Sequence, residues 1–151
     1  MKPVSAGFII RSAGKYLICH ATQDTTFKMD NIHWTISKGM VEEGETSINA
    51  AIRELKEETG IDLRNDVQVD GLESLMPIKI LPLSKKIIHA YYIDDPNGIL
   101  QEKELHCSSK IDNKTHRLYG YPEMDAYLWV SKETATKLVF DTQKSLFDEL
   151  P

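Results

Sequence analysis

The segment between Thr46 and Gly60 constrains the fold most, because it carries the start, the end and the buried face of one helix. Thr46 or Ser47 can cap a helix N-terminus, and Gly60 stands where a left-handed residue commonly ends one. Between them, side chains suited to burial recur at the spacing of helical turns: Ile48, Ile52, Leu55 and Thr59. The sequence therefore predicts a helix that ends at Thr59 and packs one face against a core.

A second face of the same helix is acidic. At about 100° per residue, the side chains of Glu54, Glu57 and Glu58 lie within an arc of about 100° beside the apolar stripe. Three like charges at this spacing repel one another unless a cation lies between them. Arg53 can hold one of these carboxylates in position. The pattern favours a divalent metal site, although an acidic helix face can also simply meet water.

The rest of the chain contains mostly strand-like segments. We expect strands at 4–11, 16–21, 34–36, 67–76, 86–93 and 126–130, with loops at 22–33 and 37–45. A second helical region begins after Ser131, reaches about residue 150 and is broken near Asp141. Residues 100–121 show no clear period. The order predicts one α+β domain over 1–151, a mixed sheet with helices on its faces.

Composition narrows the range of functions. The chain has 151 residues and a net charge of −5, and residues 42–58 hold six acidic and two basic side chains. The remainder is close to neutral, which argues against DNA as a partner. The two cysteines and five histidines lack the spacing of a disulfide framework or a zinc site. No apolar run is long enough for a signal peptide or a membrane span, so we expect a soluble cytoplasmic protein.

Residues 39–61 read GMVEEGETSINAAIRELKEETGI. They match all nine specified positions of the pattern G-x5-E-x7-R-E-U-x-E-E-x-G-U, in which U is apolar. The segment thus resembles the Nudix box. The resemblance implies the Nudix fold, a mixed sheet sandwiched between helices (α/β/α) with the box as loop–helix–loop. It also implies hydrolysis of a nucleoside diphosphate linked to another moiety, with Mg²⁺ or Mn²⁺ as the cofactor.

The resemblance assigns roles to the residues of the box. The implied metal ligands are the carboxylates of Glu54, Glu57 and Glu58 and the backbone carbonyl of Gly39. Arg53 would orient a metal-binding carboxylate, and Glu45 would support the loop and the ligands from behind. These roles agree with the preference of Mg²⁺ for hard oxygen ligands. A cation bridging phosphate oxygens also neutralises the charge that develops during attack on a P–O–P bond.

Two segments outside the box extend the resemblance. Residues 34–39 (WTISKG) are similar to the W-x-x-P-K-G run of diadenosine polyphosphate hydrolases, with Ser37 in place of proline. Lys38 would then contact substrate phosphate and Trp34 would lie beside the substrate, whereas a plain loop lysine is the alternative. Residues 121–129 (YPEMDAYLW) resemble the F-P-E-x-D-x-x-x-W segment of uncharacterised Nudix proteins. Glu123 would be a general base or an extra metal ligand, the alternative being a surface acid.

Two further residues are candidates for substrate binding. In diadenosine tetraphosphate hydrolases, the strand that Lys86 begins carries a phosphate-binding lysine and a base-stacking tyrosine. Here Ala90 stands at the approximate position of that tyrosine, which weakens the case for adenine stacking. Tyr127 matches a second aromatic residue of that family, and a structural tyrosine would look the same. Base–aromatic stacking contributes about 1–3 kcal/mol per base.

The leading hypothesis is a Mg²⁺-dependent pyrophosphohydrolase. Water would attack phosphorus in a nucleoside or dinucleoside polyphosphate, with diadenosine polyphosphates favoured by the segment around Lys38. One alternative is the removal of pyrophosphate from RNA 5′ ends, although residues 100–120 hold only four basic side chains against three acidic ones. A non-catalytic nucleotide-binding sensor is the alternative of another class. The expected partner is then a small nucleotide, and we expect no association with a membrane. We expect the chain to be a monomer or a homodimer.

Overall fold

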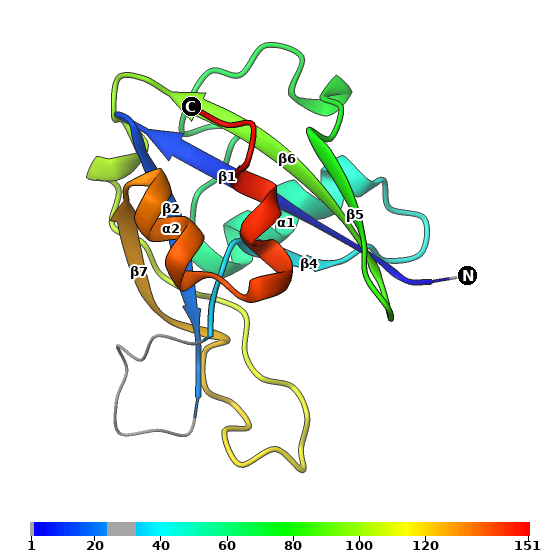
Figure 1. Cartoon of the computed structure of the whole chain (residues 1–151). Helices are drawn as coiled ribbons and strands as arrows, with labels where there is room; N and C mark the ends of the chain where they lie inside the picture. Colours follow the sequence, from blue (N-terminus) through cyan, green and yellow to red (C-terminus); the bar gives the residue numbers. More distant parts are fainter. Residues whose placement is uncertain (1, 24–32) are drawn as a thin grey trace.

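A computed structural model describes residues 2–23 and 33–151, and in this part of the chain seven strands form one mixed sheet (Figure 1). The strands are β1 (Val4–Ser12), β2 (Lys15–Ala21), β3 (Trp34–Thr35), β4 (Ser37–Met40), β5 (Lys79–Pro82), β6 (Ile87–Asp95) and β7 (Met124–Val130). Their order is β3-β2-β1-β6-β5, with β4 added beside β1 and β7 beside β2. The α-helices are α1 (Ser47–Thr59) and α2 (Lys132–Leu138), and the 3₁₀-helices are η1 (Leu72–Ser74), η2 (Leu100–Glu102) and η3 (Asp141–Phe147).

Helices cover both faces of the sheet, as the α/β/α prediction requires. Strand β1 is apolar on both sides and is almost wholly buried, which is typical of a central strand. Ala6, Phe8 and Ile10 pack with α1, whereas Ile9 packs on the other face with α2 and η3. Figure 1 shows the red and orange C-terminal helices in front of the sheet and the teal α1 behind it. The period-2 alternation of β1 thus sends side chains into two separate cores.

Helix α1 follows the sequence prediction. The side chain of Thr46 accepts a hydrogen bond from the backbone N–H of Asn49 at 3.2 Å, and Gly60 closes the helix with a left-handed φ of 81°. The C-terminal helical region is also confirmed, with Ser131 as its cap. It breaks after Leu138, where the chain becomes extended before η3 begins.

The segment from 34 to 40 lies where β1 and β2 diverge. Strand β2 pairs with β1 only at Lys15 and Tyr16 and then continues beside β7. Residues 34–35 pair with β2, and residues 37–40 cross over to pair with β1. We expected a loop from residue 37, but its backbone hydrogen bonds to β1 make it a strand in spite of its polar side chains. Lys38 lies directly opposite Gly7, whose Cα is so close to β4 that an added Cβ would overlap it.

Two other expectations differ from the structure. The strand expected at 67–76 is an irregular segment with η1, because Gly71 turns the chain (φ 65°) and Val67 and Val69 pack onto the core without pairing. Strand β5 was not predicted, since it is a short edge strand that contains a proline. Residues 100–121 contain η2 and otherwise no regular element. Most of the loop expected at 22–33 falls outside the described residues.

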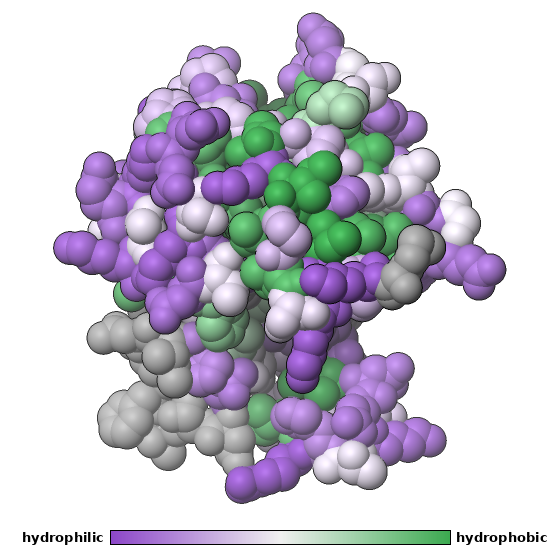
Figure 2. All heavy atoms as spheres, turned by 45° about the vertical axis from the view of Figure 1, so that its right-hand side comes forward, coloured by the Kyte–Doolittle hydropathy of each residue, from purple (hydrophilic) through white to green (hydrophobic). Residues whose placement is uncertain are grey.

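The open edge at β5 exposes apolar side chains. Met76, Ile78 and Ile80 are exposed although they are large and apolar. The face turned forward in Figure 2 carries a patch of apolar surface between polar side chains. Such patches can serve as contact surfaces, so the monomer or homodimer expectation stays a prediction. Among the described residues, no helix is both long enough and apolar enough to cross a membrane.

A buried glutamine supports the bend between β3 and β4. Ile36 belongs to neither strand, and its backbone N–H donates to Oε1 of Gln143 at 3.0 Å. Nε2 of Gln143 donates in turn to the Thr35 hydroxyl at 2.8 Å. Gln143 comes from η3 and is 2% exposed, so a side chain far along the chain satisfies the backbone at this bend.

Replacing this glutamine therefore tests how much the bend depends on it. Gln143→Ala should lower the free energy of unfolding by about 1–3 kcal/mol, because it leaves the buried Ile36 N–H without its acceptor. Urea denaturation of both proteins measures the change. Gln68→Ala, at an exposed position, is the control and should leave stability within about 0.5 kcal/mol of wild type. Equal stability of all three proteins would contradict this account of the bend.

Candidate active site

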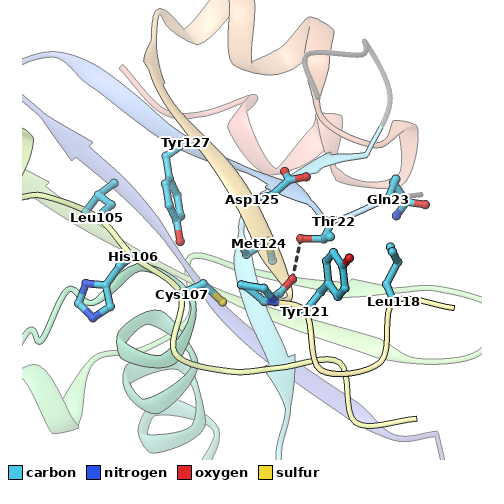
Figure 3. Close-up of a pocket in the computed structure, with 11 residues that line it drawn as sticks. Thr22, Gln23, Leu105, His106, Cys107, Leu118, Tyr121, Met124, Asp125 and Tyr127 are labelled. Carbon is cyan, nitrogen blue, oxygen red and sulfur yellow. Dashed lines mark hydrogen bonds between the residues drawn. The ribbon is translucent and has the colours of Figure 1, made fainter. Parts of the chain in front are cut away.

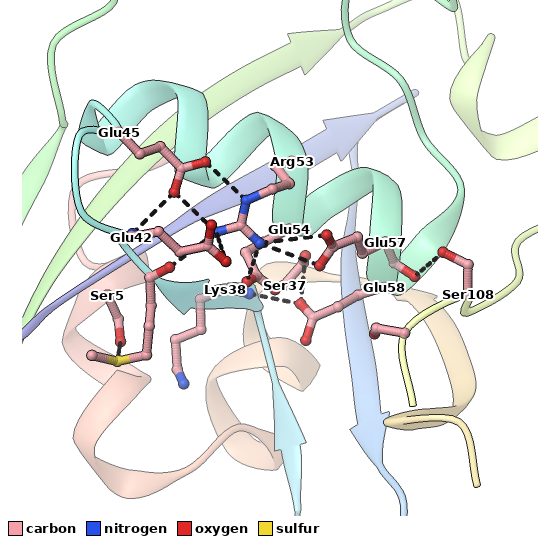
Figure 4. A network of polar contacts seen from close by, with 12 residues as sticks. Ser5, Ser37, Lys38, Glu42, Glu45, Arg53, Glu54, Glu57, Glu58 and Ser108 are labelled. Carbon is pink, nitrogen blue, oxygen red and sulfur yellow. Dashed lines mark hydrogen bonds and ion pairs between the residues drawn. The ribbon is translucent and has the colours of Figure 1, made fainter. Parts of the chain in front are cut away.

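Arg53 is the centre of a polar network on α1 (Figure 4). Its Nε and Nη2 donate to the two carboxylate oxygens of Glu45 at 2.8 and 3.0 Å, and Nη2 also donates to the Met40 carbonyl at 3.0 Å. Nη1 donates to Glu54 at 2.8 Å and to Glu57 at 3.3 Å. The hydrogen bond from Arg53 holds the pKa of Glu45 below its usual range. One guanidinium thus ties the loop before α1 to the acidic face of the helix.

Glu58 is the most buried carboxylate of that face, with 2% of the residue exposed. One oxygen, Oε1, accepts from the Ser37 hydroxyl at 2.8 Å and from the Lys38 backbone N–H at 2.9 Å. Burial raises the pKa of Glu58 to about 8, although the Ser37 hydrogen bond acts in the opposite direction. The carboxylate is therefore positioned by strand β4 but is poorly stabilised in its charged form by the protein alone.

Glu54 lies against the backbone of β4. A Cβ added to Gly39 would overlap the Glu54 carboxyl group, so only glycine leaves room for it at this position. Burial raises the pKa of Glu54, and the hydrogen bond from Arg53 lowers it in part. The first glycine of the 39–61 pattern thus brings a backbone segment and a helix carboxylate into contact.

Two lysines lie beside these carboxylates. Lys38 comes from β4 and Lys86 directly precedes β6. Burial lowers the pKa of Lys38 to about 8, the nearby charge of Lys86 lowers it further, and Glu58 and Glu54 act in the opposite direction. The site therefore places two cationic groups next to an acidic cluster.

Glu123, directly before β7, lies within electrostatic range of the same cluster. Its backbone is held on two sides, since its N–H donates to the Ser109 carbonyl and its carbonyl accepts from the Thr22 N–H. Burial raises the pKa of Glu54 and of Glu58 most, and the negative charge of Glu123 raises both further. Its carboxylate is exposed and lies within electrostatic range of both groups.

Comparison with known proteins agrees with this geometry. The model of the NUDIX domain family matches residues 1–144. The chain belongs to the NUDIX family. It is a Nudix hydrolase, an enzyme that acts on phosphorus anhydrides, as the names of two curated relatives also indicate.

The first relative is the asymmetrical bis(5′-nucleosyl)-tetraphosphatase of Mus musculus, 25% identical over 118 residues that cover 78% of this chain and 69% of the relative. The second is the RNA pyrophosphohydrolase of Pelagibacter ubique (strain HTCC1062), 29% identical over 119 residues that cover 78% and 71%.

Solved structures show the same Nudix fold. The E. coli dihydroneopterin triphosphate pyrophosphohydrolase superposes with a TM-score of 0.63 at 20% identity, covering 97% of this chain and 93% of that one. A C. elegans Ap4A hydrolase binary complex superposes with a TM-score of 0.61 at 22% identity, covering 96% and 93%.

The structure brings most of the predicted site residues together. The residues in or beside the network around Arg53 are Lys38, Gly39, Glu45, Glu54, Glu57, Glu58, Lys86 and Glu123. Trp34 lies elsewhere, because its side chain points to the α2 face of the sheet and is 1% exposed. Trp34 therefore has almost no exposed surface with which it could contact a substrate. Tyr127 donates its hydroxyl to the Glu58 carbonyl, which joins β7 to the last turn of α1.

Sequence reasoning missed the role of Ser37. This residue stands where the related pattern has proline, and its hydroxyl supplies a hydrogen bond to Glu58 that proline cannot make. The substitution itself was the available signal, because a hydroxyl beside a buried carboxylate is a potential donor. The chain thus replaces a rigid residue with one that orients a carboxylate of the box.

A pocket of about 620 Å³ adjoins the site, between β7 and the irregular segment 105–122 (Figure 3). Its segment is attached to the end of α1, where Ser108 N–H donates to the Glu57 carbonyl at 2.7 Å and His106 N–H to the Thr59 carbonyl at 3.1 Å. The volume is within the range of about 300–1,000 Å³ that is usual for small-molecule sites. Of its lining residues, the sequence singled out Tyr127 as a candidate for substrate binding, but not the wall formed by residues 105–118, because that stretch has no periodic pattern.

The donor set fits a hard divalent cation, since three carboxylates share one helix face and one of them, Glu54, lies against the backbone of Gly39. Within residues 2–23 and 33–151, however, no three such side chains already surround a common point at ligand spacing. Glu54 and Glu57 are paired with Arg53, and Glu58 is bonded to β4. A cation would therefore need to draw the carboxylates away from these partners.

Burial of Glu58 predicts an unusual pH dependence of stability in the metal-free protein. Its pKa rises from 4.5 to about 8 on folding, so between these values the folded state binds the extra proton. The free energy of unfolding should therefore fall as pH rises from 5 to 8, by up to about 1.4 kcal/mol per pH unit from this group. Lys38, with its pKa lowered to about 8, contributes only above this window, where it acts in the opposite direction.

Urea denaturation at several pH values, with a chelator present, measures this slope. Glu58→Gln should flatten it, because the amide does not titrate. The exposed Glu43→Gln should retain the wild-type slope. An identical slope in wild type and Glu58→Gln would contradict the assignment.

Proposed function

We propose that this Nudix hydrolase is a Mg²⁺-dependent pyrophosphohydrolase of nucleoside or dinucleoside polyphosphates. The observation that carries the proposal is the meeting of an acidic helix face with Lys38 and Lys86 around the backbone of Gly39. An anionic polyphosphate needs cationic partners, and a divalent ion held by carboxylates supplies charge that lysines alone do not.

We assign the metal to Glu54, Glu57, Glu58 and the carbonyl of Gly39. When bound, Mg²⁺ would neutralise charge on the phosphates and lower the pKa of a coordinated water. Arg53 and Glu45 would keep the ligand carboxylates and the loop in place, as their hydrogen bonds do here. Mn²⁺ has the same preference for oxygen ligands and is the alternative ion.

The remaining groups have roles in binding the substrate and moving a proton. Lys38 and Lys86 would donate to phosphate oxygens, and burial makes such charge-assisted hydrogen bonds stronger than in water. Glu123 would accept the proton of the attacking water, since the residue is exposed and its charge lies within electrostatic range of Glu54 and Glu58. The carboxylates of the box are then free to remain metal ligands during attack.

The substrate that the sequence favours is a diadenosine polyphosphate, and one curated relative is named bis(5′-nucleosyl)-tetraphosphatase, a name that specifies a dinucleoside but no base. The support is the position of Lys38 beside the box. The RNA 5′ end is a second candidate, because the other curated relative is named RNA pyrophosphohydrolase. A non-catalytic sensor would bind nucleotide and leave the anhydride intact, so a hydrolysis assay separates it from both.

Removal of a metal ligand should abolish hydrolysis while leaving the fold. Glu57 is the half-exposed member of the acidic face, so Glu57→Gln should fold normally. Because charge stabilisation by the metal contributes several kcal/mol to the barrier, we expect a fall in kcat of at least about a hundredfold. The assay follows Mg²⁺-dependent release of ATP and AMP from diadenosine tetraphosphate, with a panel of nucleoside triphosphates and 5′-triphosphorylated RNA beside it.

The exposed Glu43→Gln is the matched control and should keep full activity. Binding of nucleotide without turnover of any anhydride by the wild type would favour the sensor instead.

Removal of a phosphate-binding lysine should weaken substrate binding more than chemistry. Lys86→Gln takes one charged donor from the phosphates, which usually contributes about 1.5–3 kcal/mol. KM should therefore rise by about 10- to 100-fold, with a smaller change in kcat, in steady-state assays. Its neighbour Lys85 is exposed, and Lys85→Gln should leave KM within about twofold. An unchanged KM for Lys86→Gln would exclude Lys86 from the phosphate site.

A further inference from the structure

The pocket beside α1 differs in chemistry from the site around Arg53. Its walls are largely apolar or aromatic, with Leu105, Cys107, Leu118, Tyr121, Met124 and Tyr127 among them. Among the described residues, no lysine or arginine lines it, and Asp125 is its one carboxylate. A phosphate group would meet the carboxylate of Asp125 there and, among the described residues, no lysine or arginine. The pocket is therefore suited to a neutral, flat ring system.

The walls suit an aromatic ring because they include two tyrosines, one of which is held in place by a hydrogen bond. Tyr121 and Tyr127 come from different segments, and Figure 3 shows Tyr127 and Asp125 extending from the same strand, β7. The hydroxyl of Tyr127 is already bonded to the Glu58 carbonyl, which fixes its ring as a rigid wall. That hydrogen bond also joins the pocket to the last turn of α1, where Glu57 and Glu58 lie.

Asp125 is oriented by a residue behind it. Its Oδ1 lies 2.6 Å from Nδ1 of His20, which is completely buried. An ionised carboxylate can only accept hydrogen bonds, so this contact fixes Nδ1 of His20 as the donor. The other oxygen, Oδ2, accepts no hydrogen bond from any residue that the structure describes, and the side chain is 17% exposed. A ligand in the pocket can thus reach a carboxylate that is held in place and still has acceptor capacity.

From this geometry we infer that the pocket binds a ring that carries two adjacent N–H donors, namely a ring N–H beside an amino group. Asp125 is the residue that accepts hydrogen bonds from both donors. Two neighbouring donors can bind one carboxylate side by side, which adds both energy and geometric selectivity. Guanine carries this edge, and so does a pterin ring. The inference rests on the proposed function, because it places the base of the substrate whose phosphates meet the metal site.

Other bases fit the carboxylate less well. Adenine and cytosine each present an amino group beside a ring nitrogen that is a hydrogen-bond acceptor. Each base would therefore place an acceptor opposite the Asp125 carboxylate, which is itself an acceptor. Hypoxanthine keeps the ring N–H and lacks the amino group. Bidentate base contacts discriminate against the wrong base by about 1–3 kcal/mol, which corresponds to roughly 5- to 150-fold in affinity. The base in this pocket is therefore guanine or a similar ring in preference to adenine, and only the phosphate part of the resemblance to diadenosine hydrolases applies here.

Calorimetric binding of nucleoside monophosphates tests this without turnover. Wild-type protein should bind GMP at least about tenfold more tightly than AMP, with IMP weakened relative to GMP. Asp125→Asn keeps an oxygen for His20 but replaces the second acceptor with a donor. This variant should lose the GMP preference and gain affinity for AMP, because an amide matches the adenine edge. Asp112→Asn, at an exposed position outside the pocket, should retain the wild-type ratios.

The outcomes separate the inference from the hydrolase proposal. Equal affinity of wild type for GMP and AMP, or an unchanged ratio in Asp125→Asn, overturns the role of Asp125. If that variant unfolds, the comparison of GMP with IMP on wild type still decides. Competition between guanosine and neopterin distinguishes the two sources of the same edge. Triphosphate hydrolysis without base preference overturns only this inference, whereas a GMP preference without any hydrolysis overturns only the proposed activity.

Discussion

The hydrogen bonds of Arg53 are the interaction on which the site depends. A guanidinium offers five donors in a fixed plane, and here they reach Glu45, Glu54, Glu57 and the Met40 carbonyl. The two bonds to Glu45 fix the loop relative to α1, and the bonds to Glu54 and Glu57 offset repulsion on the acidic face. A lysine could supply the charge at this position but not the planar set of directions.

Arg53 does not reach Glu58, whose position is set by strand pairing. Burial makes the charged form of this group costly, and Ser37 and the Lys38 N–H offset that cost only in part. Strand β4 holds both donors because it pairs with β1, where Gly7 permits the close approach. The stability of the central sheet therefore keeps a carboxylate in a place that its own electrostatics disfavours. The cation that we propose would stabilise the charged form of this group.

Local signals in the sequence were enough to predict α1, its end at Gly60 and the packing of helices on the sheet, and they narrowed the N-cap to Thr46 or Ser47. The spacing of Arg53 and the three helix carboxylates predicted that they would lie together on α1, whereas the place of Glu45 beside them was implied only by the resemblance to the Nudix box. What could not be predicted depends on contacts between distant segments. Trp34 looked like a substrate residue because of its neighbours in sequence, yet the alternation of β3 turns it into the core beside α2. The support of Ile36 by Gln143 likewise joins residues more than a hundred positions apart.

The contrast between local and long-range contacts also distinguishes the residues proposed for metal binding from those proposed to select the substrate. The groups proposed to hold the metal lie on α1 and β4, whose backbones are fixed by helix and sheet hydrogen bonds. The pocket is built from β7 and from residues 105–122, which have almost no regular structure and are attached to α1 through His106 and Ser108. A segment without a periodic pattern can change its side chains without disturbing the sheet. The two curated relatives, which bear the names of enzymes for different substrates, are what one expects of a fold that fixes the carboxylates and leaves the pocket free to vary.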